Sequence, residues 1–191
     1  LGESASGLSL PFQGRWHTRH RRLSPHDLAW QLVERGYLEQ AIQYINQNHQ
    51  LLESHYNMPK LLTLVGNAEL GRGKAGDAIS YYRQALKLDV NYSEAQNNLA
   101  WILATHPDEK LRDGVAAIGL ATRAVGQQRG DVVSMLDTLS AAYAEGGQFE
   151  QAVKVAKKAI DIARARGRIT QATPTDDRLN QSKAGLPHRS N

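Results

Sequence analysis

The chain has 191 residues, of which 22% are charged and none is cysteine, so it is long enough for one domain or one short array with a real core. No apolar run approaches the roughly 20 residues needed to span a bilayer, and the lack of cysteine excludes disulfides, thiolate catalysis and cysteine-ligated zinc. The net charge of +4 comes from the two ends, where four Arg stand against one acid in residues 1–23 and six Lys or Arg against two acids in residues 164–191. A nucleic-acid binder more often carries its basic residues along one face of the body, so we expect no nucleic-acid partner.

Residues 1–23 read as a basic arm or linker. Its stretch RWHTRHRR places His17 and His20 three residues apart, but the surrounding arginines would repel a cation, so neither these nor His26 is expected to bind a metal. The start, LGESASGLSLPF, lacks the basic beginning and apolar centre of a signal peptide, which leaves the localisation open. Membrane contact would come only from a flanking segment outside the chain or from this arm, which could also touch acidic lipid or nucleic acid.

The first helical unit, about 24–58, begins SPHDLAWQLVERGYLEQAIQYI. Ser24 is a typical N-cap, with a proline in the first turn and Asp27 three residues after the cap. Gly36 separates two stretches of helical spacing, and Ala41 and Ile45 lie on the apolar face of the second. The pattern predicts two helices joined at a glycine turn.

The second unit, about 59–92, carries the same pattern around GRGKAG, which runs from Gly71 to Gly76 and has the spelling of a dinucleotide-binding loop. Such a loop must follow a strand directly, whereas GNAEL separates the glycines from the apolar LLTLV. A phosphate loop would need Gly at Ala68 and Ser or Thr at Ala75. Three glycines inside one helix would each cost roughly 1 kcal/mol relative to alanine. We therefore predict a turn between two helices and no nucleotide cofactor.

The third and fourth units, about 93–130 and 131–166, reveal an internal repeat. Gly73, Ala78, Tyr82 and Ala85 are matched 74 residues later, which is two unit lengths, by Gly147, Ala152, Ala156 and Ala159. The third unit has a longer turn, ATHPDEKLRDG, whose acids lack the ligand order of an EF-hand loop. Neither a G-x-S-x-G motif nor an arguable Ser/His/Asp set is present, so no catalytic residue is expected.

A unit of about 34 residues with two helices, small residues at their crossing and a turn glycine resembles the tetratricopeptide repeat. The resemblance covers about Ser24 to Ala163. It implies an all-α fold of helix–turn–helix repeats stacked in a right-handed superhelix, and a non-catalytic scaffold that binds a protein or peptide segment in its concave groove. The oligomeric state is not indicated.

The phase of the repeat selects candidate groove residues on the first helix of each unit. Tryptophan supplies a large contact area, and asparagine can hold a peptide backbone through both its donor and its acceptor. For Trp30 and Trp101, packing between repeats is an equal alternative. The cations that would clamp a C-terminal carboxylate are missing at Ser134 and Thr138. The selected residues are Trp30, Lys60, Thr63, Asn67, Asn97, Asn98, Trp101, Ser134, Asp137 and Ala141.

The tail, residues 167–191, contains TPTDDRLNQSKAG, with a helix start at Thr175 and a stop at Gly185. It predicts a short, easily frayed capping helix from about 176 to 183, folded back on the last repeat. The ending Gly185-x-Pro187-x-Arg189 and the last two units also resemble the C-terminal repeats of bacterial membrane-bound or catalytic proteins, such as sulfatases and glycosyltransferases. The alternative function is therefore an accessory domain of a larger glycan-modifying or membrane-bound enzyme.

Overall fold

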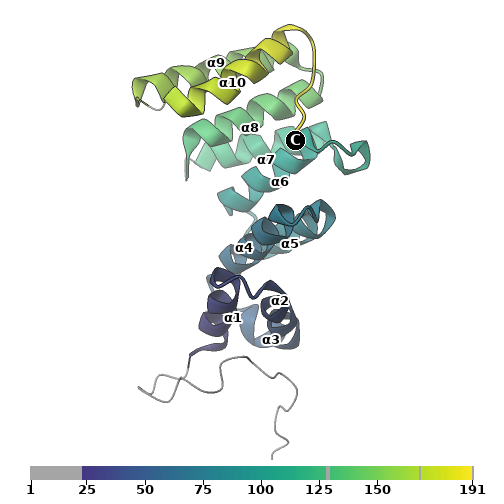
Figure 1. Ribbon diagram of the computed structural model, residues 1–191, viewed down its shortest axis with the longest axis vertical. Helices are drawn as coiled ribbons and strands as arrows, with labels where there is room; N and C mark the ends of the chain where they lie inside the picture. Colours follow the sequence, from purple (N-terminus) through teal and green to yellow (C-terminus); the bar gives the residue numbers. More distant parts are fainter. Residues whose placement is uncertain (1–22, 128–129, 168, 191) are drawn as a thin grey trace, which may run out of the picture.

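The computed structural model describes residues 23–127, 130–167 and 169–190. Throughout these residues the secondary structure is helical, without a strand, and the helices stack in pairs along one long axis (Figure 1). This confirms the predicted all-α fold. The elements are α1 Pro25–Glu34, α2 Leu38–Gln47, α3 His49–Leu52, α4 Met58–Gly71, α5 Ala75–Leu88, α6 Ser93–Thr105, the 3-10 turn η1 Glu109–Leu111, α7 Gly114–Gln127, α8 Val132–Glu145, α9 Phe149–Ala165 and α10 Ile169–Lys183.

GRGKAG forms the turn between α4 and α5, as predicted. Gly71 is the last residue of α4, and Lys74 is the N-cap of α5. Gly73 has a φ of +77°, in the left-handed region that glycine adopts without a steric penalty. Gly147, at the equivalent place between α8 and α9, has a φ of +73°. The repeated glycine is therefore explained by backbone geometry.

Small residues let the two helices of a pair approach closely. A Cβ atom added to Gly66 of α4 would lie 2.6 Å from Cε1 of Tyr82, which is fully buried on α5. The repeated alanines Ala78, Ala85, Ala152 and Ala159 are likewise fully buried. The small side chains of the repeat thus decide how tightly each pair closes.

The first pair is built less regularly than the others. Its N-terminus carries the predicted cap, since the Ser24 hydroxyl accepts from the Asp27 amide at 3.1 Å and donates to the Asp27 carboxylate at 2.8 Å. Its second helix, α2, stops at Gln47, and the chain continues through the short α3. As a result α2 touches α4 at few points, whereas α7 packs along α8.

The C-terminal helix is longer than the sequence predicted. α10 begins at Ile169, so Thr175 is a buried residue within the helix and not its start. Helix α10 lies along α9 and reaches α8 (Figure 1). It takes the position that the first helix of a next pair would have. The predicted start at Thr175 was wrong, since Thr175 is buried within a helix that packs along α9.

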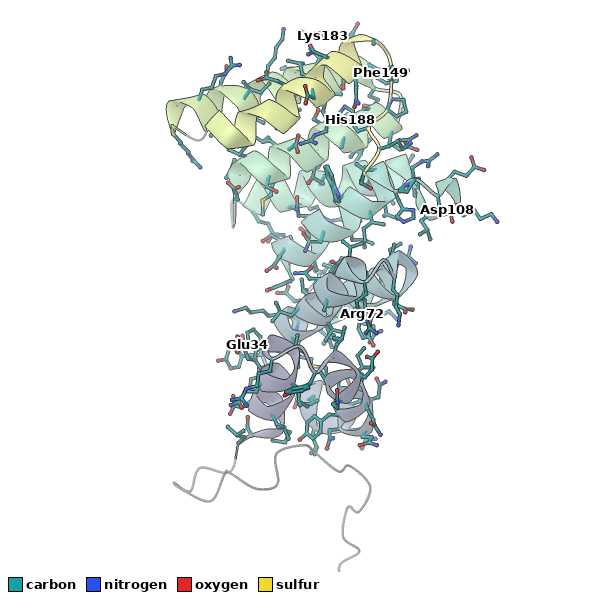
Figure 2. The ribbon with its side chains drawn as sticks, viewed as in Figure 1. Glu34, Arg72, Asp108, Phe149, Lys183 and His188 are labelled. Atoms are coloured by element: carbon teal, nitrogen blue, oxygen red, sulfur yellow. The ribbon has the colours of Figure 1, made fainter. Side chains whose placement is uncertain are left out.

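After α10 the chain turns back toward α6 as an extended segment, residues 184–190, which we call the strap (Figure 2). His188 is buried, with its Nε2 atom 2.9 Å from the Arg178 carbonyl oxygen and 3.0 Å from the Ser182 hydroxyl. Because a carbonyl only accepts, Nε2 carries the proton that it donates there. In the neutral ring, Nδ1 is then the nitrogen without a proton. This atom is buried and has no hydrogen-bond partner in the structure.

The far end of the strap contacts two earlier layers of the array. Arg189 Nη1 donates to Glu145 Oε2 of α8 at 2.7 Å, and the Ser190 amide donates to the Thr105 carbonyl of α6 at 2.8 Å. Glu145 also accepts from Arg112 Nε at 2.9 Å. The strap therefore ties α10, α8 and α6 together along the edge where the first helices end.

Candidate functional site

Two adjoining hollows run along the first helices of the second, third and fourth pairs. One, of about 590 Å³, lies among α4, α6, α8 and α10, and the other, of about 460 Å³, lies at the N-terminal ends of α6 and α8. Both are lined by Asn97, Asn98 and Ser134. We call the joined hollows the inner groove. The larger hollow is also lined by Asn67, Leu70, Gly71, Tyr82, Trp101, Asp137, Thr138 and Arg178.

A chain of hydrogen-bonded amides forms the floor of the inner groove. Asn67 Oδ1 accepts from the Tyr82 hydroxyl and from Asn98 Nδ2, each at 2.8 Å. Asn97 Nδ2 makes a longer contact of 3.4 Å with Asn98 Oδ1. Burial raises the pKa of Tyr82 to about 12. These contacts fix the orientations of Asn67 and Asn98.

Asn97 is only partly satisfied within this chain of amides. Its Oδ1 atom is buried and has no hydrogen-bond partner in the structure. A buried acceptor without a donor costs about 1 to 3 kcal/mol. The Asn97 amide is therefore less well satisfied within the chain than the amides of Asn67 and Asn98.

One wall of the inner groove is built around Trp101 on α6 and Asp137 on α8. Arg178 of α10 donates from Nε to Asp137 Oδ1 at 2.9 Å, and its Nη2 pairs with Asp137 Oδ2. The guanidinium carbon lies 5.4 Å from the centre of the Trp101 ring. Asp137 and Trp101, both selected from the repeat phase, thus meet at one point of the groove.

Trp30 and Lys60, selected from the first and second units, meet outside the inner groove. Lys60 Nζ lies 4.7 Å from the centre of the Trp30 ring, a cation–π geometry. Trp30 is partly buried and packs against the core. It therefore serves the contact between α1 and α4.

Two selected residues belong to the core, which corrects their assignment to the groove. Thr63 is fully buried, and its hydroxyl donates to the Pro59 carbonyl oxygen at 2.8 Å within the same helix. Because this bond satisfies the hydroxyl, threonine can be buried at little cost. Ala141 is also fully buried. The repeat phase alone did not separate these covered positions from the open ones.

Arg178 and Tyr82 contribute to the groove but were not selected from the sequence. Arg178 lies in the tail, beyond the four repeat units predicted from the sequence. Tyr82 lies on a second helix, yet its hydroxyl reaches Asn67 across the pair. Continuing the alternation of first and second helices one step past α9 would have placed α10 beside the groove.

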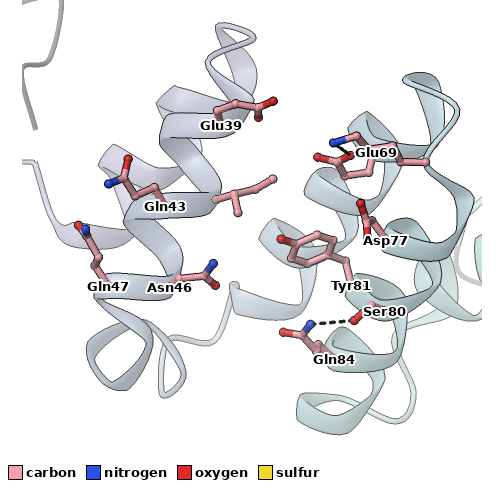
Figure 3. A pocket seen from close by; sticks show the side chains of 11 residues that line it. Glu39, Gln43, Asn46, Gln47, Glu69, Asp77, Ser80, Tyr81 and Gln84 are labelled. Carbon is pink, nitrogen blue, oxygen red and sulfur yellow. Dashed lines mark hydrogen bonds and ion pairs between the residues drawn. The ribbon is translucent and has the colours of Figure 1, made fainter.

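A second cleft, of about 740 Å³, opens on the outer side between α2 and α5 (Figure 3). Its Glu69 is 2% exposed and lies 3.4 Å from Arg72 Nη1 and 3.6 Å from Lys74 Nζ. Arg72 also pairs with Glu39 of α2. The two cations of the GRGKAG turn thus neutralise buried charge from within the chain.

The described residues contain no cluster of three or more His, Cys, Asp or Glu side chains placed to hold a metal ion. His17 and His20 lie outside the described residues, whereas His26 stacks on His55 with ring centres 3.8 Å apart. None of the described helices has both the length and the apolarity needed to cross a membrane.

Solved structures with similar folds come from several repeat proteins. MamA from Desulfovibrio magneticus RS-1 is 18% identical, with a TM-score of 0.56 over 84% of this chain and 92% of that one. PilW, a type IV pilus biogenesis factor, is 15% identical, with a TM-score of 0.53 over 84% and 76%. BtubC from P. vanneervenii is 18% identical, with a TM-score of 0.53 over 87% and 84%. At these identities the likeness concerns the fold.

Sequence comparison gives the family. A search of curated proteins finds no match. A family model described as tetratricopeptide repeat matches residues 3–170, which is most of the chain and includes part of the basic arm. Together with the stacked helix pairs and the glycine turns, this match shows that the chain belongs to the tetratricopeptide repeat family.

Proposed function

We propose that the chain is a non-catalytic scaffold that binds a peptide or protein segment in the inner groove. The observation that carries the proposal is the row of asparagine side chains, Asn67, Asn97 and Asn98, that lines one hollow, with Asn67 and Asn98 held in place by a hydrogen bond. An extended segment has one amide donor and one carbonyl acceptor per residue, and asparagine side chains can pair with both. Trp101 supplies apolar contact area next to these amides.

The experiment is a pull-down from the source cell followed by mass spectrometry, with Asn98→Ala as the groove variant. The control is Asn46→Ala, which removes an exposed asparagine of α2 that lines the outer cleft. For a partner captured by the wild type, Asn98→Ala should weaken binding by roughly 1 to 3 kcal/mol, and Asn46→Ala should leave it unchanged.

The same experiment distinguishes groove binding from a structural role of Asn98. Melting temperatures of both variants are measured beside their affinities. An Asn98→Ala variant that loses stability as much as it loses binding would place Asn98 among the residues that only hold the fold. Equal binding by all three proteins would show that the segment binds elsewhere.

We propose, as a second candidate, an accessory domain of a larger glycan-modifying or membrane-bound enzyme. It is favoured by the ending Gly185-x-Pro187-x-Arg189, which resembles the ends of such chains and forms the strap here. Gly185 has a φ of +69° at the turn into the strap, and Arg189 contacts Glu145 of α8. Two residues of the motif therefore shape the strap and attach it to the array. A catalytic or membrane-spanning segment encoded in the same gene would support this candidate, and a gene without one would exclude it.

A further inference from the structure

Arg178 brings a charged side chain of the chain itself into the inner groove. Its guanidinium forms a two-point contact with the Asp137 carboxylate and lies over the Trp101 ring. The three side chains line the same hollow as Asn67, Asn97 and Asn98. The Arg178 side chain of α10 therefore already occupies one end of the proposed binding site.

Asp137 has a strong requirement for a cation at this place. Its side chain is 13% exposed, and leaving a carboxylate unpaired at such a depth is costly. A segment that pushes Arg178 aside must therefore supply another cation. A segment that does not supply one has to leave Arg178 where it is.

The shape of the site favours a guanidinium over an ammonium. A guanidinium is planar, so it can donate two parallel hydrogen bonds to a carboxylate while its face stacks on an aromatic ring. Asp137 and Trp101 are placed to use both properties at once. A lysine ammonium is a compact point charge and would lose the two-point contact.

Arg178 itself can leave without unfolding α10. Its side chain is 21% exposed, whereas the helix is held by other groups, including the buried Leu179 and the His188 contact to the Arg178 backbone oxygen. Rotation of the Arg178 side chain toward solvent would therefore vacate the site and leave these contacts of the helix in place.

We propose that Asp137 and Trp101 form an arginine-binding subsite of the inner groove, held by Arg178 until an arginine of a bound partner segment replaces it. This inference rests on the proposed function of the groove and names one chemical feature of its partner. Arg178 therefore competes with the partner, and a segment without arginine gains no contact at this end.

The test uses two capped tripeptides, acetyl-Gly-Arg-Gly-amide and acetyl-Gly-Gln-Gly-amide, and the indole N–H resonance of Trp101 in nitrogen-15-labelled protein. The Arg178→Ala variant should bind the arginine tripeptide about tenfold or more tightly than the glutamine one. The wild type should bind the arginine tripeptide more weakly than this variant does. Adding Asp137→Asn to Arg178→Ala should abolish the preference for arginine.

Arg164→Ala is the matched control, because it removes an arginine that pairs with α10 at the exposed Asp176 and not in the groove. It should behave as the wild type. If Arg178→Ala does not fold by circular dichroism, Arg178→Lys replaces it, and this variant should still bind the arginine tripeptide more tightly than the wild type. Equal affinity for the two tripeptides in a folded variant, or no saturable change at Trp101, would overturn the inference.

The groove proposal and the arginine inference fail in different ways. The groove proposal fails if binding of the captured partner does not depend on Asn98. The arginine inference fails if the preference for arginine over glutamine is missing, whatever the effect of Asn98→Ala on the captured partner.

Discussion

The helices at the two ends of the array are held to their neighbours by different contacts. At the C-terminal end, α10 covers α9 and the strap ties it to α8 and α6 through polar contacts. At the N-terminal end, α2 barely touches α4, and Leu51 and Tyr56 are 68% and 83% exposed. The last repeat is thus held by a hydrogen-bonded strap. Among the described residues, the first pair is joined to the second by the Arg72–Glu39 ion pair and the Lys60–Trp30 contact, with little packing of α2 on α4.

The strongest test of this comparison removes the C-terminal ties. Truncation after Gly167 deletes α10 and the strap, exposes the face of Val153, Ala156 and Ile160, and leaves Asp137 without Arg178. The expected loss is about 3 kcal/mol of unfolding free energy, or roughly 6 to 12 °C in melting temperature. Thermal denaturation and light scattering measure the loss and the expected association. An unchanged melting temperature and a strictly monomeric product would show that these ties contribute nothing.

A second test introduces steric strain between α4 and α5, in the N-terminal half of the chain. Gly66→Ala places a Cβ atom 2.6 Å from Tyr82 Cε1, and overpacking of this kind costs about 2 kcal/mol. Gly76→Ala is the control, because its Cβ would meet nothing within 4 Å and alanine favours a helix. Native-state hydrogen exchange should show faster opening of α1 to α5 than of α8 to α10. Uniform acceleration along the chain would mean that the two ends unfold as one unit.

Acid should loosen both ends, because each contains a buried histidine. Burial lowers the pKa of His188, and burial followed by the charge of His55 lowers that of His26. Each neutral imidazole therefore stabilises the fold above the unfolded pKa of about 6.5, and this contribution is lost as the pH falls through the lowered pKa. Between these two values stability should fall by about 1.4 kcal/mol per pH unit for each histidine.

Thermal denaturation between pH 7 and 5 measures this loss, with His188→Gln and His26→Gln separating the two ends. Around His188, Arg178 and Arg189 disfavour protonation, whereas the Arg178 carbonyl and Asp137 favour it. His188→Gln should remove the loss of hydrogen-exchange protection at low pH in residues 178–190, measured relative to the intrinsic exchange rate at each pH, and leave that of α1 unchanged. A wild type that is equally stable at both pH values would contradict this prediction.

The smallest expected effect concerns the cap of α1. Ser24→Ala removes the hydroxyl that accepts from the Asp27 amide, at a typical cost of about 1 kcal/mol. Because the first pair is loosely packed on the second, we expect this cost to appear as fraying of α1 with little change in the main transition. Hydrogen exchange in α1 measures the fraying, and the melting temperature measures the main transition. A shift of the whole unfolding transition would show that the first pair is firmly coupled to the second.

The groove residues stay a prediction, but the structure shows which of the selected positions line a hollow. Asn67, Asn98 and Trp101 were selected by the phase of the repeat, and all three line the larger hollow. Thr63 shares that phase, yet neighbouring helices cover it, and coverage depends on how the pairs stack. A periodic pattern marks which side of a helix faces inward, but not how far the next element extends over it.

The sequence by itself determined the helix pairs, their turns and the family, because the spacing of apolar residues, the small residues at the crossing and the turn glycines act within one or two helices. Only the tertiary structure decided the strap and the pairing of Arg178 with Asp137. Ser190 and Thr105 are 85 residues apart in the chain, and Arg178 and Asp137 are 41 apart. Such contacts leave no periodic trace, since they form only after stacking has fixed the positions of α6, α8 and α10 relative to one another.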